Sequence, residues 1–300
     1  MPERIPSRGT PSDLIRTLIV TGMTDVHHDW RKTTPALKEL LEQTGRFEVR
    51  VTEEFRGATA ETLEPYDLVV LNYYGRSDPW RDVPEERFGP VAEQALFDFV
   101  ASGKGLIAYH PTLAGGVGWD PEYERLLGGV MREETSRRAP NNDFLVHTAE
   151  PHPITAGWPA EFPHYNDDLY VGLKWPEGVR KTVLLKGWDN PLRYTQVPSQ
   201  WRSLPGMGED HPLAWAVEYG EGRSVSIGIG HNEQAIGHPA FRALFPRSAE
   251  WAATGAVTIP TPGDLGEAVE GGDWWPTTLE PMVRGMFNDW VAAGEPASQK

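Results

Sequence analysis

Short apolar runs separated by amphipathic stretches dominate the first half of this 300-residue sequence. The runs DLVVL (67–71) and GLIAY (105–109) are almost continuously apolar, as expected for strands that are covered on both faces. Between them, residues 86–102 carry apolar side chains at helical spacing and are followed by a glycine. This alternation predicts an α/β fold in which a mostly parallel sheet lies between two layers of helices.

The same patterns predict the remaining elements and the domain organisation. Further strands are expected at 17–21 and 47–51, and helices at 34–43, 122–127 and 239–253. After residue 140 the sequence becomes richer in strands, with 213–219 and 223–229 joined as a hairpin by GEGR. We expect an N-terminal extension (1–13), one domain (14–259) with added loops and hairpins, and a tail (260–300) with a short helix around 282–291.

Composition excludes several classes of function. The net charge of -15, without a basic stripe, argues against a nucleic-acid partner. The absence of cysteine excludes disulfides, thiolate metal ligands and a cysteine nucleophile. The N-terminal segment lacks the apolar core of a signal peptide, and no apolar run approaches the length of a membrane helix. A cytoplasmic protein without a membrane partner is therefore expected.

Polar side chains follow several of the predicted strands. His27 and His28 come after the first strand, Asn72 after 67–71, His110 directly after 105–109, and His231 after the last strand. In open parallel sheets, ligands bind outside the carboxyl ends of the strands. We therefore expect these side chains to lie around one crevice, although a single histidine at a strand end often only bonds a neighbouring loop.

Converging imidazoles support two kinds of chemistry, and the sequence leaves both open. Three neutral histidines, here His28, His110 and His231, can bind zinc or a related divalent metal and leave one position for water or substrate. Histidine also titrates near neutrality and can act as general acid or base. No local metal signature such as H-E-x-x-H is present, so spacing alone does not establish a cofactor.

Aromatic residues offer a further hint. The chain has 12 tryptophans, many of them in Pro/Gly-rich sequence, where they either pack loops onto the core or stack on the apolar faces of a sugar. We take Tyr73 and Trp119 as candidates for such a substrate wall. The other histidines, among them His152, His164 and His238, are expected to cap helices and loops.

Taken in order, a set of segments resembles the ThuA-like family, which is named for a trehalose-utilisation protein. The segments include HHDWRKTTPALKELLEQTGRFEV, YDLVVLNYYG, ALFDFVASGKGLIAYHPT, YNDDLY and HPLAWAVEYGEGRSVSIGIGH, and the full set covers roughly residues 14 to 259. The resemblance implies a flavodoxin-like three-layer fold similar to class I glutamine amidotransferases. Where those enzymes carry a cysteine nucleophile this chain has His110, and His231-Asn232-Glu233 echoes their H-x-E. Without cysteine, glutaminase activity should be absent.

The resemblance also implies a role in carbohydrate metabolism, often beside dehydrogenases that make 3-keto sugars. A keto group acidifies the neighbouring C–H bonds, so a histidine base, with or without a metal, could drive isomerisation, elimination or glycosidic cleavage. We expect His28, His110 and His231 to be central, with Asp168 of YNDDLY as the acid/base carboxylate and Glu233 as a further catalytic group. Asp167 competes with Asp168, and is otherwise expected to bind substrate with His27 and Asn72.

A second interpretation stays open. The chain could be a non-catalytic carbohydrate-binding or regulatory protein, because a binding crevice needs aromatic walls and polar groups but no proton transfer. In either case the expected partner is a small carbohydrate. The tail after residue 259 is expected to serve as an oligomer contact or a lid.

Overall fold

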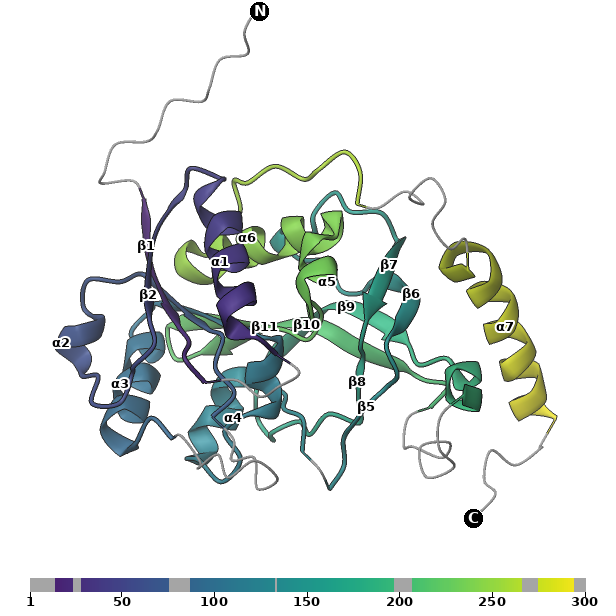
Figure 1. Ribbon diagram of the computed structural model, residues 1–300, viewed down its shortest axis with the longest axis horizontal. Helices are drawn as coiled ribbons and strands as arrows, with labels where there is room; N and C mark the ends of the chain where they lie inside the picture. The colour runs from purple at the N-terminus through teal and green to yellow at the C-terminus, as the bar shows by residue number, and fades with distance from the viewer. Residues whose placement is uncertain are drawn as a thin grey trace, which may run out of the picture.

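The computed structural model describes residues 14–23, 28–75, 87–132, 134–196, 207–265 and 275–293. Within these residues, a nine-stranded sheet has the order β2-β1-β3-β4-β11-β10-β9-β6-β7 (Figure 1). The strands, in that order, are Phe47–Thr52, Ile15–Val20, Leu68–Leu71, Gly105–Tyr109, Gly222–Ile227, Asp210–Tyr219, Lys181–Trp188, Asn142–Thr148 and Glu161–Asp167. The strands β5 (Arg137–Arg138) and β8 (Tyr170–Val171) form a separate two-stranded ribbon.

The sheet has a parallel half and an antiparallel half. Strands β2, β1, β3, β4 and β11 run parallel to one another, and each pairing from β11 through β10, β9 and β6 to β7 is antiparallel. The reversal follows from the two-residue connection between Tyr219 and Gly222, which are paired, because so short a turn can join only antiparallel strands. The α/β fold is confirmed, and the expected hairpins extend the main sheet itself.

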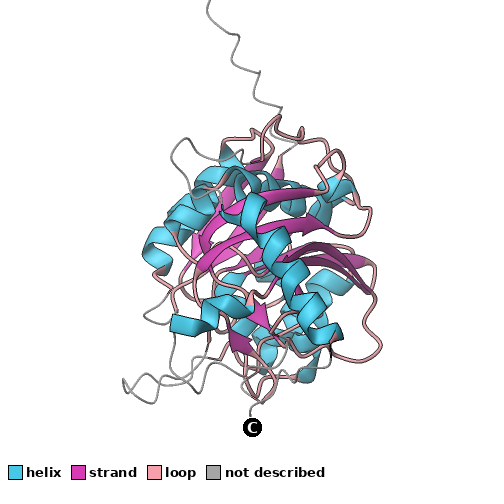
Figure 2. Ribbon diagram, turned by 90° about the vertical axis from the view of Figure 1, so that its right-hand side faces the viewer, coloured by secondary structure: helices cyan, strands magenta, loops and turns pink. Residues whose placement is uncertain are grey.

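Helices cover both faces of the sheet. One layer holds α1 (Trp30–Glu42), α5 (Glu233–Gly237) and α6 (Pro239–Thr254), and the other holds α2 (Ala60–Leu63), α3 (Pro90–Ala101) and α4 (Pro121–Leu127) (Figures 1 and 2). Within β3, Leu68 and Val70 belong to one core cluster while Val69 and Leu71 belong to the other. Alternate residues of a strand face opposite sides, which is why a strand between two layers is apolar throughout.

The described part of the tail packs against the body of the protein. Helix α7 (Trp275–Ala292) is longer than the short helix expected at 282–291, and it lies along β6 and β7 at the end of the molecule (Figure 1). Glu280 is buried there, and its Oε2 accepts a hydrogen bond of 3.0 Å from the Leu145 amide. The N-terminal extension (1–13) lies outside the described residues. No helix in the described ranges is long and apolar enough to span a membrane.

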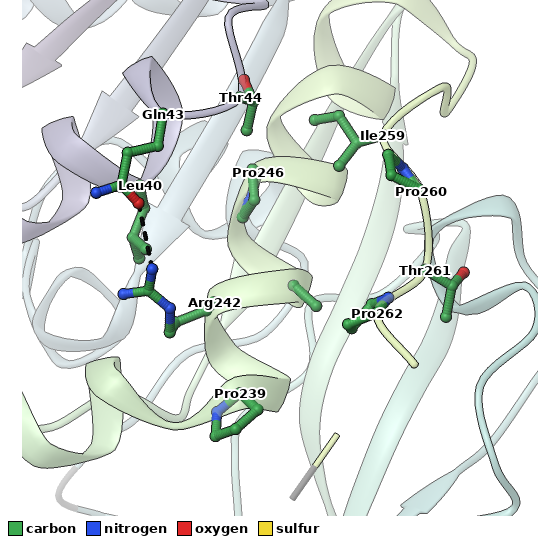
Figure 3. A pocket seen from close by; sticks show the side chains of 11 residues that line it. Leu40, Gln43, Thr44, Pro239, Arg242, Pro246, Ile259, Pro260, Thr261 and Pro262 are labelled. Carbon is green, nitrogen blue, oxygen red and sulfur yellow. Dashed lines mark hydrogen bonds between the residues drawn. The ribbon is translucent and has the colours of Figure 1, made fainter. Parts of the chain in front are cut away.

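A groove of about 430 Å³ lies between α1, α6 and the segment that follows α6 (Figure 3). Its walls are mostly apolar, with Pro246 and Ile259 on opposite sides and the Arg242 guanidinium bonded to Gln43 at one end. None of the site residues expected from the sequence lines this groove. The groove of Figure 3 is therefore separate from the histidine cluster described next.

Candidate functional site

Three of the predicted histidines meet at the carboxyl ends of the parallel strands. His110 directly follows β4, His231 comes shortly after β11, and His28 lies between β1 and α1. One ring nitrogen of each lies within 4.8 Å of the others, and the ring centroids are 4.7 to 5.2 Å apart. Residues that follow parallel strands emerge at one edge of the sheet. This rule correctly predicts that the three histidines lie close together.

Contacts on both ring nitrogens fix the orientation of His110. Its Nδ1 donates to the Gly228 carbonyl at 2.6 Å, which leaves Nε2 with the lone pair. Nε2 lies 3.1 Å from Nδ1 of His231 and 3.0 Å from the hydroxyl of Tyr170, whose ring also stacks on the imidazole. Burial, and then the nearby His28 and His231, lower the pKa of His110 well below its usual value. The imidazole is therefore neutral, as a metal ligand must be.

Asp168 supplies the carboxylate of this site. Its Oδ1 lies 3.4 Å from Nδ1 of His231 and 3.6 Å from Nε2 of His110, and its Oδ2 lies 3.2 Å from Nε of Arg138. The side chain is fully buried, and neither oxygen accepts a hydrogen bond from the described residues. Burial, reinforced by the charge of Asp167, raises the pKa of Asp168 well above its usual value. Asp168 therefore retains a proton at pH values where an exposed aspartate is ionised.

Asp167 has a different task, so the two neighbouring aspartates can now be told apart. Its Oδ1 accepts hydrogen bonds from the amides of Asp168 (2.9 Å) and His231 (3.0 Å), and its Oδ2 accepts from the Gly230 amide (2.6 Å). His164 adds a fourth donor, with Nε2 at 2.7 Å from Oδ2. With four N–H donors on a fully buried carboxylate, Asp167 anchors the backbone of the site. Its four bonds are all to the protein itself, whereas the sequence had suggested a contact with substrate.

The turn before His231 depends on glycine. Gly230 has φ of 99°, a region that L side chains rarely adopt, and an added Cβ would lie 2.4 Å from the Phe241 ring. The same turn is held from the other side by the hydroxyl of Tyr109, which donates to the Gly230 carbonyl. The side chains of Phe241 and Tyr109 thus constrain the direction in which His231 leaves the sheet.

Several other predicted residues are placed differently. Asn72 is fully buried, and its Nδ2 donates at 2.9 Å to both Thr33 and Thr34, so it fastens the start of α1 to the end of β3. Tyr73 and Trp119 are only 5% and 6% exposed and belong to the core cluster beneath the sheet. In the structure these three side chains therefore pack and bond within the protein, away from the three histidines.

In the segment His231-Asn232-Glu233, which matches H-x-E, the glutamate does not lie beside the histidine. Glu233 is the exposed first residue of α5, and its carboxylate pairs with Lys32 at 3.4 Å. The carboxylate that the structure places beside His231 is Asp168, which comes from the end of β7. His27 lies outside the described residues.

The sequence analysis missed three residues of this site. It did correctly predict that two histidines, His152 and His238, cap the elements that follow them. Tyr170, Arg138 and His164 contact His110, Asp168 and Asp167 respectively, although the YNDDLY segment contains the tyrosine. The only sequence signal for His164 was its position three residues before Asp167. His152 and His238 do cap, since each ring accepts from the backbone amide two residues later.

Comparison with known proteins agrees with this fold and these segments. The family model for ThuA, described as trehalose utilisation, matches residues 16–252. This chain belongs to the ThuA family. A ThuA-like protein from Parabacteroides merdae is 26% identical with a TM-score of 0.68, and the match covers 84% of this chain and 94% of that one. A ThuA-like protein from Bacteroides uniformis has the same fold at 17% identity, with a TM-score of 0.60 and coverage of 86% and 98%. No curated protein matches the sequence significantly.

The donor set of this ThuA-family site fits a divalent metal. His28, His110 and His231 offer three ring nitrogens, and Asp168 adds a carboxylate oxygen beside two of them. Ligand atoms around a tetrahedral zinc ion are separated by about 3.3 Å, given bonds of about 2.0 Å. The contacts among Nε2 of His110, Nδ1 of His231 and Oδ1 of Asp168 are 3.1, 3.4 and 3.6 Å. Nitrogen ligands with one carboxylate suit zinc better than calcium or magnesium.

Proposed function

We propose that this ThuA-family protein is an enzyme that acts on a sugar or 3-keto sugar, with zinc or a related metal held by His28, His110 and His231. The observation that carries the proposal is the placement of Asp168: its buried Oδ1 accepts no hydrogen bond from the residues that the structure describes, and it faces two of the three imidazoles. A buried carboxyl group left unbonded costs stability, so such an arrangement is typical of a functional site. The family description, trehalose utilisation, supports a carbohydrate as substrate.

The described residues suggest how a small molecule reaches this centre. His110 and Asp168 are fully buried, whereas the His231 side chain is 11% exposed and the Arg138 side chain is 36% exposed. These two side chains therefore border the open side of the centre. Arg138 also contacts Asp168, so a substrate oxygen bound by its guanidinium would lie close to the carboxyl group.

Proton transfer by Asp168 is the step that these residues serve best. When the three histidines alone hold the metal, the ionised form of Asp168 removes a proton from the carbon next to a keto group, and the electron pair of that C–H bond moves onto the carbonyl oxygen. Return of the proton to the other face gives an isomer, whereas departure of a group from the next carbon gives elimination. When bound, a divalent metal polarises the carbonyl oxygen and stabilises the charge that develops there.

A keto sugar is favoured over an ordinary sugar because of the base that is present. A C–H bond of an unoxidised sugar is too weakly acidic for a carboxylate, whereas a neighbouring carbonyl group lowers its pKa enough for general-base catalysis. The proposed substrate is therefore a 3-keto glucoside, such as the 3-keto form of trehalose.

Hydrogen–deuterium exchange tests this proposal without knowledge of the final product. Zinc-loaded protein is incubated in D₂O with 3-keto trehalose, and proton NMR follows the signals of the carbons beside the keto group. We expect exchange well above the protein-free rate, a loss of about 100-fold or more in Asp168→Asn, and no change in His147→Gln, an outlying histidine of β6. Binding without exchange would favour a carbohydrate-binding protein, and the absence of both would overturn the proposal.

A further inference from the structure

A second pair of histidines lies behind Asp167. His164 on β7 is fully buried, and its Nε2 lies 2.7 Å from Oδ2 of Asp167. His238, which caps the start of α6, is 7% exposed, and its ring centroid is 4.6 Å from that of His164 at an interplanar angle of 70°. The proton-transfer step proposed above uses neither histidine. Burying two imidazoles beside a carboxylate needs an explanation of its own, because each polar atom loses its contact with water.

The hydrogen bonds of this pair define the tautomer of each ring. Both oxygens of Asp167 already accept from backbone amides, so the side chain acts as an acceptor and Nε2 of His164 carries the hydrogen. Nδ1 of His164 is thereby left as an acceptor. Nδ1 of His238 accepts from the Ala240 amide at 3.3 Å, so the hydrogen of His238 resides on Nε2.

The two remaining nitrogens complement each other. His164 Nδ1 and His238 Nε2 are both buried, and neither has a hydrogen-bond partner among the described residues. One is an acceptor and the other a donor on neighbouring rings, so a small rotation or one bridging water would join them. Burial and the neighbouring His164 lower the pKa of His238 to about 3, which keeps its ring neutral and its Nε2 protonated.

We propose that His164 is a positioning residue of the ThuA-family site, acting through Asp167, and that His238 maintains the His164 tautomer required for this task. The chain of contacts runs from His238 through His164 to Oδ2 of Asp167. From Oδ1 of Asp167 it continues to the amides of Asp168 and His231, the two residues whose side chains meet in the centre. The catalytic meaning of this positioning rests on the function proposed above.

The consequence of losing His164 follows from the bonds of Asp167. Without the imidazole, Oδ2 keeps one donor among the described residues, the Gly230 amide, and three N–H groups hold the carboxylate instead of four. The carboxylate is then less firmly oriented, so the 3.4 Å contact between the side chains of Asp168 and His231, whose amides it bonds, should loosen. Displacements of about 1 Å at a reacting centre cost about 100-fold in rate, so the effect should appear in kcat more than in KM.

Two substitutions at one position test the proposal. His164→Gln keeps an N–H donor near the position of Nε2, whereas His164→Phe keeps the ring shape and removes the donor. We expect the Phe variant to bind zinc about tenfold more weakly and to lose 10- to 100-fold in kcat of deuterium exchange, with KM within about threefold. The Gln variant should lie within about threefold of the wild type in all three quantities, as should the His147→Gln control.

A further measurement needs neither metal nor substrate. Long-range ¹H–¹⁵N correlation spectra of metal-free protein report the tautomer of each histidine, and we expect the Nε2–H form for His164. In His238→Phe, which lacks the donor, the bond to Asp167 remains, and we expect the minor Nδ1–H form of His164 to become measurably more populated than in the wild type. A predominant Nδ1–H form in the wild type would overturn the proposal, as would equal kinetics and zinc affinity in the Phe and Gln variants. If the proposed function is wrong, no variant will catalyse hydrogen–deuterium exchange of 3-keto trehalose. The tautomer measurement tests the role of His238 independently of that outcome.

Discussion

Oδ1 of Asp168 lies 3.4 Å from Nδ1 of His231, although Asp168 follows a strand at the edge of the sheet and His231 follows a strand at its centre. The contact exists because Asp167 bonds to the backbone amides of both residues and so brings the two connections together. A rigid backbone framework therefore surrounds the reactive atoms, which is the arrangement that precise proton transfer and metal binding require.

Removal of a central imidazole should abolish metal binding. His110→Ala deletes the ring whose Nε2 lies 3.1 Å from His231, and three nitrogen donors become two. We expect near-stoichiometric zinc in the wild type and a dissociation constant at least about 100-fold weaker in the variant. Elemental analysis after dialysis against a weak chelator measures this, with His147→Ala as the matched control. Equal zinc contents in His110→Ala and wild type would contradict the assignment.

Loss of the Tyr170 hydroxyl should leave metal binding intact. In Tyr170→Phe the ring still stacks on His110, but the hydrogen bond of 3.0 Å to Nε2 disappears. A bound metal needs the same Nε2 lone pair, so the hydroxyl competes with it, at a cost of about 1 kcal/mol. We expect zinc affinity equal to the wild type or up to about fivefold higher by calorimetric titration. A marked fall in affinity would mean that Tyr170 itself takes part in holding the ion.

Docking of α7 should depend on pH through Glu280. Burial raises the pKa of this carboxyl to about 7 from an ordinary value of 4.5. A raised carboxyl pKa stabilises the fold fully below 4.5, and this contribution is lost as the pH rises through about 7. Glu280→Gln keeps an acceptor for the Leu145 amide and cannot ionise. We expect the variant to gain up to about 3 kcal/mol in the free energy of unfolding relative to wild type at pH 8.

Urea denaturation at pH 5 and pH 8, together with amide exchange of α7 peptides, measures this difference. Glu39→Gln on the exposed face of α1 serves as the control, because its carboxyl group is at the surface. A constant difference in stability between Glu280→Gln and wild type at both pH values would show that the carboxyl group has an ordinary pKa.

The position of Gly230 gives a prediction about the backbone itself. Gly230→Ala puts a methyl group against the Phe241 ring and forces an unfavourable φ, so we expect a loss of roughly 1–3 kcal/mol in the free energy of unfolding. Because the same turn carries His231, zinc affinity should fall as well. Gly237→Ala is the matched control, since an added Cβ at Gly237 meets nothing within 4 Å. Equal stability of both variants and wild type would contradict this account.

The sequence predicts the histidine centre well because strand ends are a strong constraint. His110 directly follows GLIAY, and the parallel arrangement of β3, β4 and β11 leaves the residues after them little freedom in where they emerge. An apolar run followed by a polar side chain is enough to predict this much. The same rule also selected Asn72, which emerges at the correct edge but turns toward α1 instead of the centre.

The rest depends on features that a single sequence does not contain. Asp167 and Asp168 are adjacent and chemically alike, and which one faces the histidines depends on the backbone at the end of β7, where Asn166 has φ of 49°. Trp119 lies in Pro/Gly-rich sequence that is equally compatible with a pocket wall or with core packing, and only the tertiary contacts decide between them. Glu233 fits a short motif but begins a helix with its side chain outward.

The division of the sheet into two halves has a consequence for the lifetime of the protein. His110 and His231 follow strands of the parallel half, whereas Asp168 follows β7 of the antiparallel half, which also carries α7. A ligand bound between these three side chains would contact both halves of the sheet, and its binding free energy would add to the free energy of unfolding of the whole chain. Removing the proposed metal with a chelator would then make even the C-terminal helix easier for proteases to cleave. The resistance of the protein to proteolysis would therefore measure how much of its site is occupied.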